Sequence, residues 1–397
     1  MRQEIHFRHQ PYRSTLPVAP YQLVPEPEEV DPSSADYTER LAASCAALTN
    51  VNLAATYLVH GTFIGNDVLG LLTELRRCSP WLSERVRQAT RGMVNCVAGE
   101  TGNYTSQFAA TFQQGIAVGA GRESPVRLFQ WSGQNNHIAR ADGAVGLICN
   151  LASLAESLSD ATLISPNQAR VMLWGHSHGG NVLALLTSLL AADREARQKF
   201  FEAARIFFTP WWGKSTDMPT WVHAEQVLED ADHPLRNLAL DIATFGTPIR
   251  YGWHGAGYNN LLHFVNHRPK AEVPAHKTRH PLHLPRFLKA TDGDYIHQLG
   301  IAGTNLMPNP LAVRTLLADL RLKKVLEHDL QPEWRLQRWS RGHRIPDEGT
   351  TLLVDYHDSH WYTPYHLAGH GTYTRSKWLP FHVTEIARQF YSAKAVV

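Results

Sequence analysis

The chain has little net charge, few cysteines and no long apolar run. Its 397 residues include 38 Lys and Arg against 36 Asp and Glu, a formal charge of +2 with histidine neutral. This balance gives no general electrostatic reason to bind nucleic acid or an anionic membrane. Apolar residues make up 43% of the chain, which excludes the disordered proteins that combine low apolar content with high net charge. The length fits one large domain with insertions, or two domains.

Targeting segments and redox motifs are also missing. The N-terminal segment lacks the apolar core and small-residue cleavage site of a secretory signal peptide. No run of about 18 apolar residues predicts a transmembrane helix. The cysteines form no CxxC pair, so we expect reduced thiols, at Cys45, Cys78, Cys96 and Cys149. These signals favour the cytoplasm, with export without a cleavable signal peptide as the alternative.

Cofactor motifs are absent as well. No GxGxxG loop follows a predicted strand, and there is no GxxxxGK[ST] phosphate loop. Histidine is plentiful, with 22 residues, and His276, His280 and His283 lie close together. Lys and Arg crowd this group, and its spacing is not that of a zinc site. We therefore expect no cofactor and no metal.

Short apolar runs alternate with helical patterns along the chain. The runs are continuously apolar, which is typical of parallel strands buried on both faces. The sequence therefore predicts an α/β fold, with a mainly parallel central sheet and helices on both faces. Strands are predicted at 54–60, 126–131, 169–174, 238–245, 261–265 and 351–356. Helices are predicted at 34–50, 67–77, 138–158, 181–192 and 380–392.

The chain divides into an N-terminal part and an α/β domain. Residues 1–50 are interpreted as an extension and a first helix, with the proline-rich stretch 1–36 as a loose arm outside the core. Residues 51–397 form the predicted domain. Insertions interrupt it at about 193–236, 267–290 and 305–348.

One short motif suggests chemistry. An apolar strand runs into a GxSxG string, and a long apolar helix follows it. In such an elbow a sharp turn exposes the serine hydroxyl, and the glycines avoid clashes with the neighbouring strand and helix. The helix N-terminus adds partial positive charge where an oxyanion would form. Ser177 is therefore the candidate nucleophile; the plain alternative is a glycine-rich turn in which Ser177 only caps the helix.

Three strings in the chain form a recognisable set: Leu58-Val59-His60-Gly61-Thr62-Phe63, Gly175-His176-Ser177-His178-Gly179-Gly180 and Thr244-Phe245-Gly246-Thr247-Pro248. Together they resemble the α/β-hydrolase superfamily, in its lipase and esterase branch. They also resemble class 3 type lipases and bacterial lipase-like effectors. The resemblance covers most of the chain from about Thr56 onward and implies the α/β-hydrolase fold with helical, lid-like insertions.

The resemblance implies an oxyanion hole made of two backbone N–H groups. One belongs to His178, which follows the nucleophile. The other comes from the loop 60–63, where we favour Thr62 over Phe63; Phe63 is also a candidate for substrate binding. The family order is serine, acid, histidine, so the base lies beyond the last strand.

Several histidines follow that last strand. Glycines flank His370, so its loop has the freedom to approach the serine, and we rank it first. His366 is second. His357 directly follows the strand, and His382 lies within the last helix; the full set of candidates is His357, His360, His366, His370 and His382.

The position of the acidic residue in the sequence departs from the family pattern. No carboxylate follows the strand 261–265, where one is expected, and we attribute this to the insertion 267–290. Asp294 lies in the next acid-bearing loop and is our first choice, with Asp292 second. Asp241, inside a strand, and Asp355 rank lower.

These residues predict a serine hydrolase that cleaves carboxylic esters through a Ser177–His370–Asp294 triad and an acyl-enzyme, without a cofactor. Lipid or phospholipid esters are the favoured substrates. The alternatives are an exported lipase-like antibacterial effector that attacks membrane phospholipid, and a non-catalytic binding module with the same fold.

An aromatic segment follows the nucleophile helix. It either forms a lid or wall for an acyl chain, with Trp211 and Trp212 binding substrate, or packs the insertion onto the domain. Because the net charge is near zero, we expect any peripheral membrane contact through these aromatics rather than through a basic surface. The segment contains Phe207, Phe208, Trp211, Trp212 and Trp221.

Overall fold

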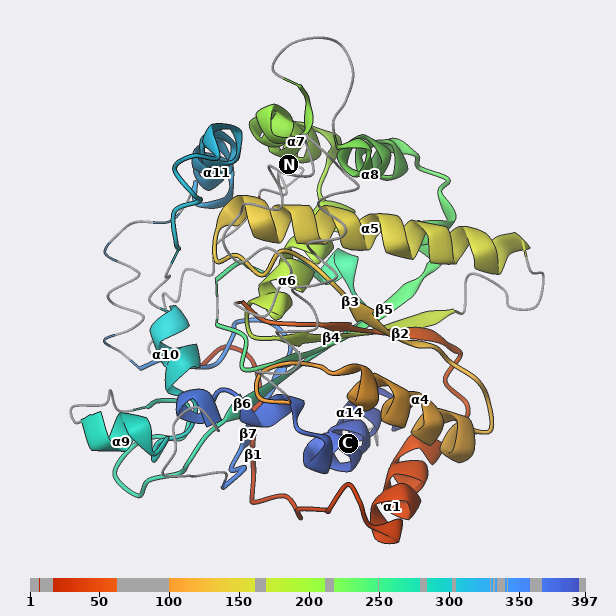
Figure 1. The fold of residues 1–397 in the computed structure, drawn as a ribbon, viewed down its shortest axis with the longest axis vertical. Helices are drawn as coiled ribbons and strands as arrows, with labels where there is room; N and C mark the ends of the chain where they lie inside the picture. Colours follow the sequence, from red (N-terminus) through yellow and green to blue (C-terminus); the bar gives the residue numbers. More distant parts are fainter. Residues whose placement is uncertain are drawn as a thin grey trace.

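The structure, a computed structural model, contains a seven-stranded sheet in the order β1-β7-β6-β5-β4-β2-β3, and all neighbouring strands are parallel (Figure 1). It describes residues 7, 17–62, 100–160, 169–210, 218–248, 250–278, 284–301, 305–328, 330, 333, 340, 342–357 and 366–392. The strands are β1 Tyr21–Val24, β2 Leu53–Val59, β3 Val126–Phe129, β4 Arg170–His176, β5 Ala239–Phe245, β6 Asn260–Asn266 and β7 Thr350–Val354. The predicted α/β class with a parallel sheet is confirmed.

Helices cover both faces of the sheet (Figure 1). One layer holds α5 His137–Asp160, α6 His178–Ala191, α7 Arg194–Phe208, α8 Pro219–Glu229 and α11 Val313–Leu326. The other holds α1 Ala35–Ala46, α4 Ser106–Ala120 and α14 Leu379–Phe390, while α9 Leu284–Leu288 and α10 Tyr295–Ile301 lie at one end. Single 3₁₀ turns are η2 Pro234–Asn237, η3 Gly255–Gly257, η4 Leu367–Gly369, η5 Thr372–Thr374 and η6 Ser376–Trp378.

The two helical layers form two separate cores because successive strand residues point to opposite faces. In β4, Val171 and Leu173 join the core under α5 and α6, whereas Met172 and Trp174 join the core under α4 and α14. All four side chains are buried. Burial on both faces explains why the strands are continuously apolar in the sequence.

The prediction of a loose N-terminal arm over residues 1–36 is wrong in part. Residues Tyr21–Val24 form β1, which pairs in register with β7 at the edge of the sheet. Prolines at positions 20, 25 and 27 bound this short strand, and a short, proline-flanked strand is tolerated at an edge, where fewer backbone groups need partners. The proline content concealed the strand in the sequence.

A second element was not predicted: helix α4. Thr105 caps its N-terminus by accepting a hydrogen bond from the backbone N–H of Phe108, and Gly121 ends it with φ 66°. Both signals are present in the sequence and are typical of helix ends. The predicted helix over 67–77 lies outside the described residues.

Helix α5 is the one described helix that is long and apolar enough by composition to cross a membrane. In the fold, 72% of its apolar window is buried. It packs against α6 and α8, so its composition is that of a core helix.

The aromatic residues after α6 pack inside the protein. Phe207, Phe208 and Trp221 are all buried, and the Trp221 ring stacks on Phe208 with ring centroids 5.1 Å apart. Their interpretation as a lid or an acyl-chain wall is therefore wrong; they hold the insertion against α5. Trp211 and Trp212 lie outside the described residues.

Two of the four cysteines, Cys45 and Cys149, are free thiols, as expected. Cys78 and Cys96 lie outside the described residues.

Candidate active site

Ser177 lies at the junction of β4 and α6 with φ 52° and ψ −132°. A positive φ is strained for a residue with a Cβ and marks a sharp turn held by its surroundings. The flanking glycines allow this turn. A Cβ on Gly175 would lie 2.8 Å from Gly180 Cα, and one on Gly179 would lie 2.5 Å from the Val59 carbonyl oxygen. The local geometry is therefore that of a nucleophile elbow.

The turn after β2 lies against Ser177. A Cβ built on Gly61 would be 2.8 Å from Ser177 Cβ, so the backbone of this turn touches the serine. His60 fixes the turn, since its Nδ1–H donates to the Gly61 carbonyl at 2.8 Å and its own carbonyl accepts from Trp131 Nε1–H at 2.8 Å. Thr62 follows directly and is half-buried. Phe63 lies outside the described residues.

His178 begins α6, and its side chain is occupied inside the protein. Its Nδ1 accepts a hydrogen bond from Asn181 Nδ2–H at 3.2 Å. Burial lowers the pKa of His178 well below its usual value, and the positive charges of Arg140 and Arg250 lower it further. The imidazole is therefore neutral, and only the backbone N–H at this helix N-terminus is placed to meet negative charge.

Asp294 and His370 form a buried pair. The Nδ1–H of His370 donates to Asp294 Oδ2 at 2.7 Å. The same oxygen accepts from Tyr373 OH at 2.8 Å, and Oδ1 accepts from the His297 backbone N–H at 2.8 Å. Burial alone would raise the pKa of Asp294, but the charge and hydrogen bond of His370 and the contact with His297 outweigh it and lower that pKa. Asp294 is thus a carboxylate.

The insertion after β6 brings Asp294 back to the end of that strand. The chain leaves the carboxyl end of β6 at Asn266 and returns to it, because the Asp294 N–H donates to the Asn266 carbonyl at 3.1 Å. The Asn266 side chain donates to the Gly369 carbonyl at 2.9 Å, next to His370. Asp294 therefore lies at the strand end where an acid is expected, although it comes much later in the sequence.

His176 connects the His370 loop to the elbow. Its Nε2–H donates to the His370 carbonyl at 3.1 Å, and the two ring centroids are 4.8 Å apart. Burial, with the neighbouring charge of His370, lowers the pKa of His176 to about 3, so the His176 ring is neutral at physiological pH. His370 therefore lies beside the residue that precedes Ser177.

The second ring nitrogen of His370 is buried. Because Nδ1 carries the proton that Asp294 accepts, a neutral His370 ring would carry its free lone pair on Nε2. Nε2 has no hydrogen-bond partner among the described residues, Ser177 included. Such contacts are often long in the absence of substrate.

The second-choice residues have other partners. His366 Nδ1 accepts from the Gly369 N–H at 3.3 Å and caps a 3₁₀ turn. Asp292 forms an ion pair with Lys270 and accepts from Tyr295 OH at 2.5 Å.

The lower-ranked residues are also engaged or distant. Asp241 is buried within β5 and binds Arg170. His382 Nε2 lies 2.8 Å from Tyr356 OH, and Asp355 lies 3.7 Å from Arg268. His357 is exposed, and His360 lies outside the described residues.

Tyr373, Asn266 and Gly246 belong to the site but were not predicted from the sequence. The Asn266 N–H donates to Tyr373 OH at 2.8 Å, so Tyr373 joins the end of β6 to Asp294. A Cβ on Gly246, whose φ is 58°, would lie 2.7 Å from Asp294 Oδ2. The glycine of the Gly246-Thr247-Pro248 string thus makes room for the acid.

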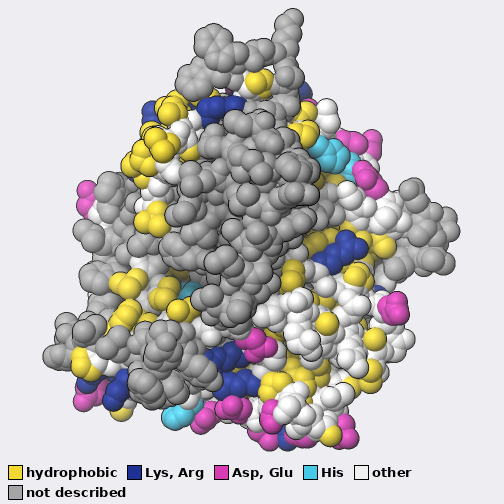
Figure 2. Space-filling model, viewed as in Figure 1, with side chains coloured by type: hydrophobic (Ala, Val, Ile, Leu, Met, Phe, Trp, Pro, Cys, Tyr) yellow, Lys and Arg dark blue, Asp and Glu magenta, His cyan; other side chains and the backbone are white. Residues whose placement is uncertain are grey.

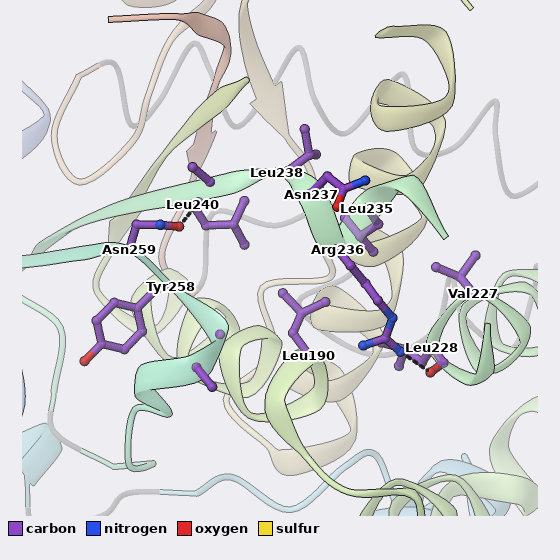
Figure 3. A pocket seen from close by; sticks show the side chains of 13 residues that line it. Leu190, Val227, Leu228, Leu235, Arg236, Asn237, Leu238, Leu240, Tyr258 and Asn259 are labelled. Atoms are coloured by element: carbon purple, nitrogen blue, oxygen red, sulfur yellow. Dashed lines mark hydrogen bonds between the residues drawn. The ribbon is translucent and has the colours of Figure 1, made fainter. Parts of the chain in front are cut away.

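A separate cavity of about 350 Å³ lies at the other end of the strands from Ser177, where β5 begins (Figure 3). Leu190 lines it from the far end of α6, roughly 20 Å along the helix axis from Ser177. The Arg236 guanidinium beside it already donates to the Leu228 carbonyl. This cavity is therefore not part of the candidate site.

No family model, curated protein or solved structure matches the chain. Within the described ranges, no group of three or more His, Cys, Asp and Glu side chains is placed to hold a metal ion.

Proposed function

We propose that the protein is a serine hydrolase of the α/β-hydrolase type that cleaves carboxylic esters. The observation that carries the proposal is the strained Ser177 turn between β4 and α6, beside the buried His370–Asp294 pair. A serine hydroxyl is a weak nucleophile at neutral pH and needs an adjacent base, and the base needs a carboxylate that fixes its tautomer. Ser177 follows the carboxyl end of β4, and Asp294 binds the end of β6, so both lie where α/β folds bind ligands.

In the proposed reaction Ser177 Oγ attacks the ester carbonyl while His370 Nε2 takes its proton. Asp294 holds the Nδ1–H tautomer and stabilises the imidazolium that forms. The backbone N–H groups of His178 and Thr62 would bind the oxyanion. His370 then protonates the leaving alcohol, and water releases the acid from Ser177 by the same steps in reverse. Lipid or phospholipid esters are the substrate class we favour.

The two neighbouring aspartates provide the test of the proposal. Asp294→Asn is expected to lower kcat on chromogenic esters of graded acyl length by about 10⁴-fold, since the amide favours the wrong tautomer of His370. Asp292→Asn is the matched control, because Asp292 pairs with Lys270 instead. Steady-state kinetics of both variants checks this. Equal activity of Asp294→Asn and wild type, or no ester hydrolysis by the wild type, would contradict the proposal.

Tyr373→Phe is expected to lower kcat roughly tenfold, because the variant loses one charge-assisted hydrogen bond to Asp294. The acid limb of kcat/KM should also move to higher pH, since Asp294 with one donor fewer holds the imidazolium more strongly. Tyr356→Phe removes an equally buried hydroxyl that contacts His382 instead. If the two variants give the same kcat and the same pH profile, Tyr373 has only a packing role.

A further inference from the structure

Large apolar side chains gather on one exposed part of the surface. Of the ten exposed large apolar residues that the structure describes, six lie between positions 299 and 320, with 39% to 85% of each exposed. We call this set the apolar strip: Leu299, Leu306, Met307, Leu311, Val313 and Leu320. Clustering of this kind on a protein surface is typical of a binding site rather than of scattered exposure.

Helix α11 buries one apolar face inside the protein and exposes a second apolar face. Its inward face buries Ala318, Leu322 and Leu326 against α7 and α5. Val313 and Leu320 are seven residues apart and share the outward face, where a helix packed on one side usually carries polar residues. The helix is therefore apolar on two sides, and only one of them has a partner among the described residues.

The exposed charged residues that α11 itself contributes, between Val313 and Leu326, are all positive. Arg321, Lys323 and Lys324 are exposed. At 3.6 residues per turn, Arg321 and Lys323 fall on opposite sides of the Val313–Leu320 line. Figure 2 shows hydrophobic side chains beside Lys and Arg side chains at the upper left, where Figure 1 places α11.

The two acidic residues of this segment point inward. Asp319 Oδ1 accepts from the Ile138 N–H at 2.9 Å. Glu327 Oε1 accepts from Arg250 at 3.1 Å and contacts His137. Both carboxylates are therefore used inside the protein and do not offset the surface cations.

The loop of the apolar strip begins near the carboxyl ends of the strands, as Ser177 does. It is anchored there by Arg140, which donates to Asn305 Oδ1 at 2.5 Å, and by the Leu306 N–H, which donates to the Asn135 carbonyl at 2.8 Å. Asn135 follows the carboxyl end of β3, and α10 begins directly after Asp294. These polar contacts fix the backbone while Leu306, Met307 and Leu311 remain exposed.

We propose that the apolar strip and the cations of α11 form a docking surface for an anionic lipid bilayer. An apolar line with flanking Lys and Arg is the pattern of a helix that lies in a membrane interface. A second copy of the chain fits less well, since a symmetric contact would place Arg321, Lys323 and Lys324 of both copies together. Docking through this surface would bring the proposed active site to lipid esters in the membrane. This role of the surface rests on the proposed function. The expectation of contact through Trp211 and Trp212 concerns residues outside the described ones.

Vesicle flotation tests this surface without catalysis, using the full chain with Ser177→Ala. We expect binding to phosphatidylcholine vesicles that contain phosphatidylglycerol, weaker binding to phosphatidylcholine alone, and a decrease with added salt. Met307→Ser with Leu311→Ser should weaken binding on the order of a hundredfold. Val118→Ser is the matched control, since Val118 is 61% exposed on α4 in the other helical layer.

A second flotation experiment tests the cations of α11. The double variant Arg321→Glu with Lys324→Glu should lose the preference for vesicles that contain phosphatidylglycerol. Arg194→Glu, at the exposed start of α7, is its control and should keep the preference. No binding by the parent protein, or an equal loss with Val118→Ser, would overturn the proposal. So would a concentration-dependent dimer that only the Met307 and Leu311 changes dissociate, because the surface would then serve a second copy.

A soluble short-chain ester separates the two proposals. With Ser177 intact, the strip variant should hydrolyse it as fast as the wild type. Vesicle binding without any ester hydrolysis would refute the proposed function and leave the docking surface standing, whereas hydrolysis without vesicle binding would do the reverse.

Discussion

Ser177→Ala is expected to lower kcat for a chromogenic ester by about 10⁶-fold, the loss found when a serine nucleophile is removed from such a site. Residual hydrolysis would come only from oxyanion donors and substrate binding. A fluorophosphonate probe should label the wild type at Ser177 and fail to label the variant. Kinetics and mass spectrometry of the labelled peptide together check this result.

Ser188→Ala is the matched control for this prediction. Ser188 lies in the same helix α6, is buried, and donates to the Ala184 carbonyl at 3.0 Å. Its loss should leave kcat and labelling unchanged. At position 177, alanine has the same Cβ and the same positive φ as serine, so the variant keeps the strained turn and the fold. Hydrolysis and labelling that persist in Ser177→Ala would assign the chemistry to another residue.

The sequence predicts the fold well where local pattern and burial agree. The strands around the elbow are continuously apolar because both faces of β4 are covered, and Gly175 and Gly179 mark a turn that no larger residue permits. Where local chemistry and tertiary role differ, prediction fails. The prolines around β1 indicate a loose arm, yet β7 offers that segment a free edge to pair with.

In the candidate site, too, residues with a local sequence signal were predicted and residues placed by tertiary contacts were not. Asp294 and His370 follow from chain order and loop context, and the structure brings these two together. Tyr373 and Asn266 carry no local signal, since their hydrogen bonds join segments 107 residues apart in the chain. The prediction of a lid around Trp221 was wrong for a related reason. An aromatic run has the same sequence pattern whether tertiary packing buries it or leaves it exposed.

Lowering the pH from 7 to 5.5 is expected to cost the folded protein on the order of 7 kcal/mol. Burial lowers the pKa of His137 and His178 well below the usual value of 6.5, and it lowers the pKa of five further histidines to about 3 or 4, on which this figure rests. That pKa falls to about 4 for His297 and to about 3 for His176, His263, His267 and His382. Their stability contribution is complete above pH 6.5 and is lost as pH falls toward the folded-state values, because the unfolded chain takes up protons that the folded chain refuses. At pH 5.5 each histidine accounts for about 1.4 kcal/mol.

This loss is comparable to the whole stability of an ordinary domain, about 5 to 15 kcal/mol, so urea unfolding should show the protein close to unfolding by about pH 5.5. His263→Gln should reduce the slope of unfolding free energy against pH by about 1.4 kcal/mol per pH unit, one proton's worth. His223→Gln is the control, since that side chain is exposed on α8 and meets solvent in both states. A free energy of unfolding that stays flat between pH 7 and 5 would show that the buried histidines take up protons within the fold. In that case the contact of a neutral His176 ring with the His370 carbonyl, which holds the loop of the proposed base, would not describe the protein in mild acid.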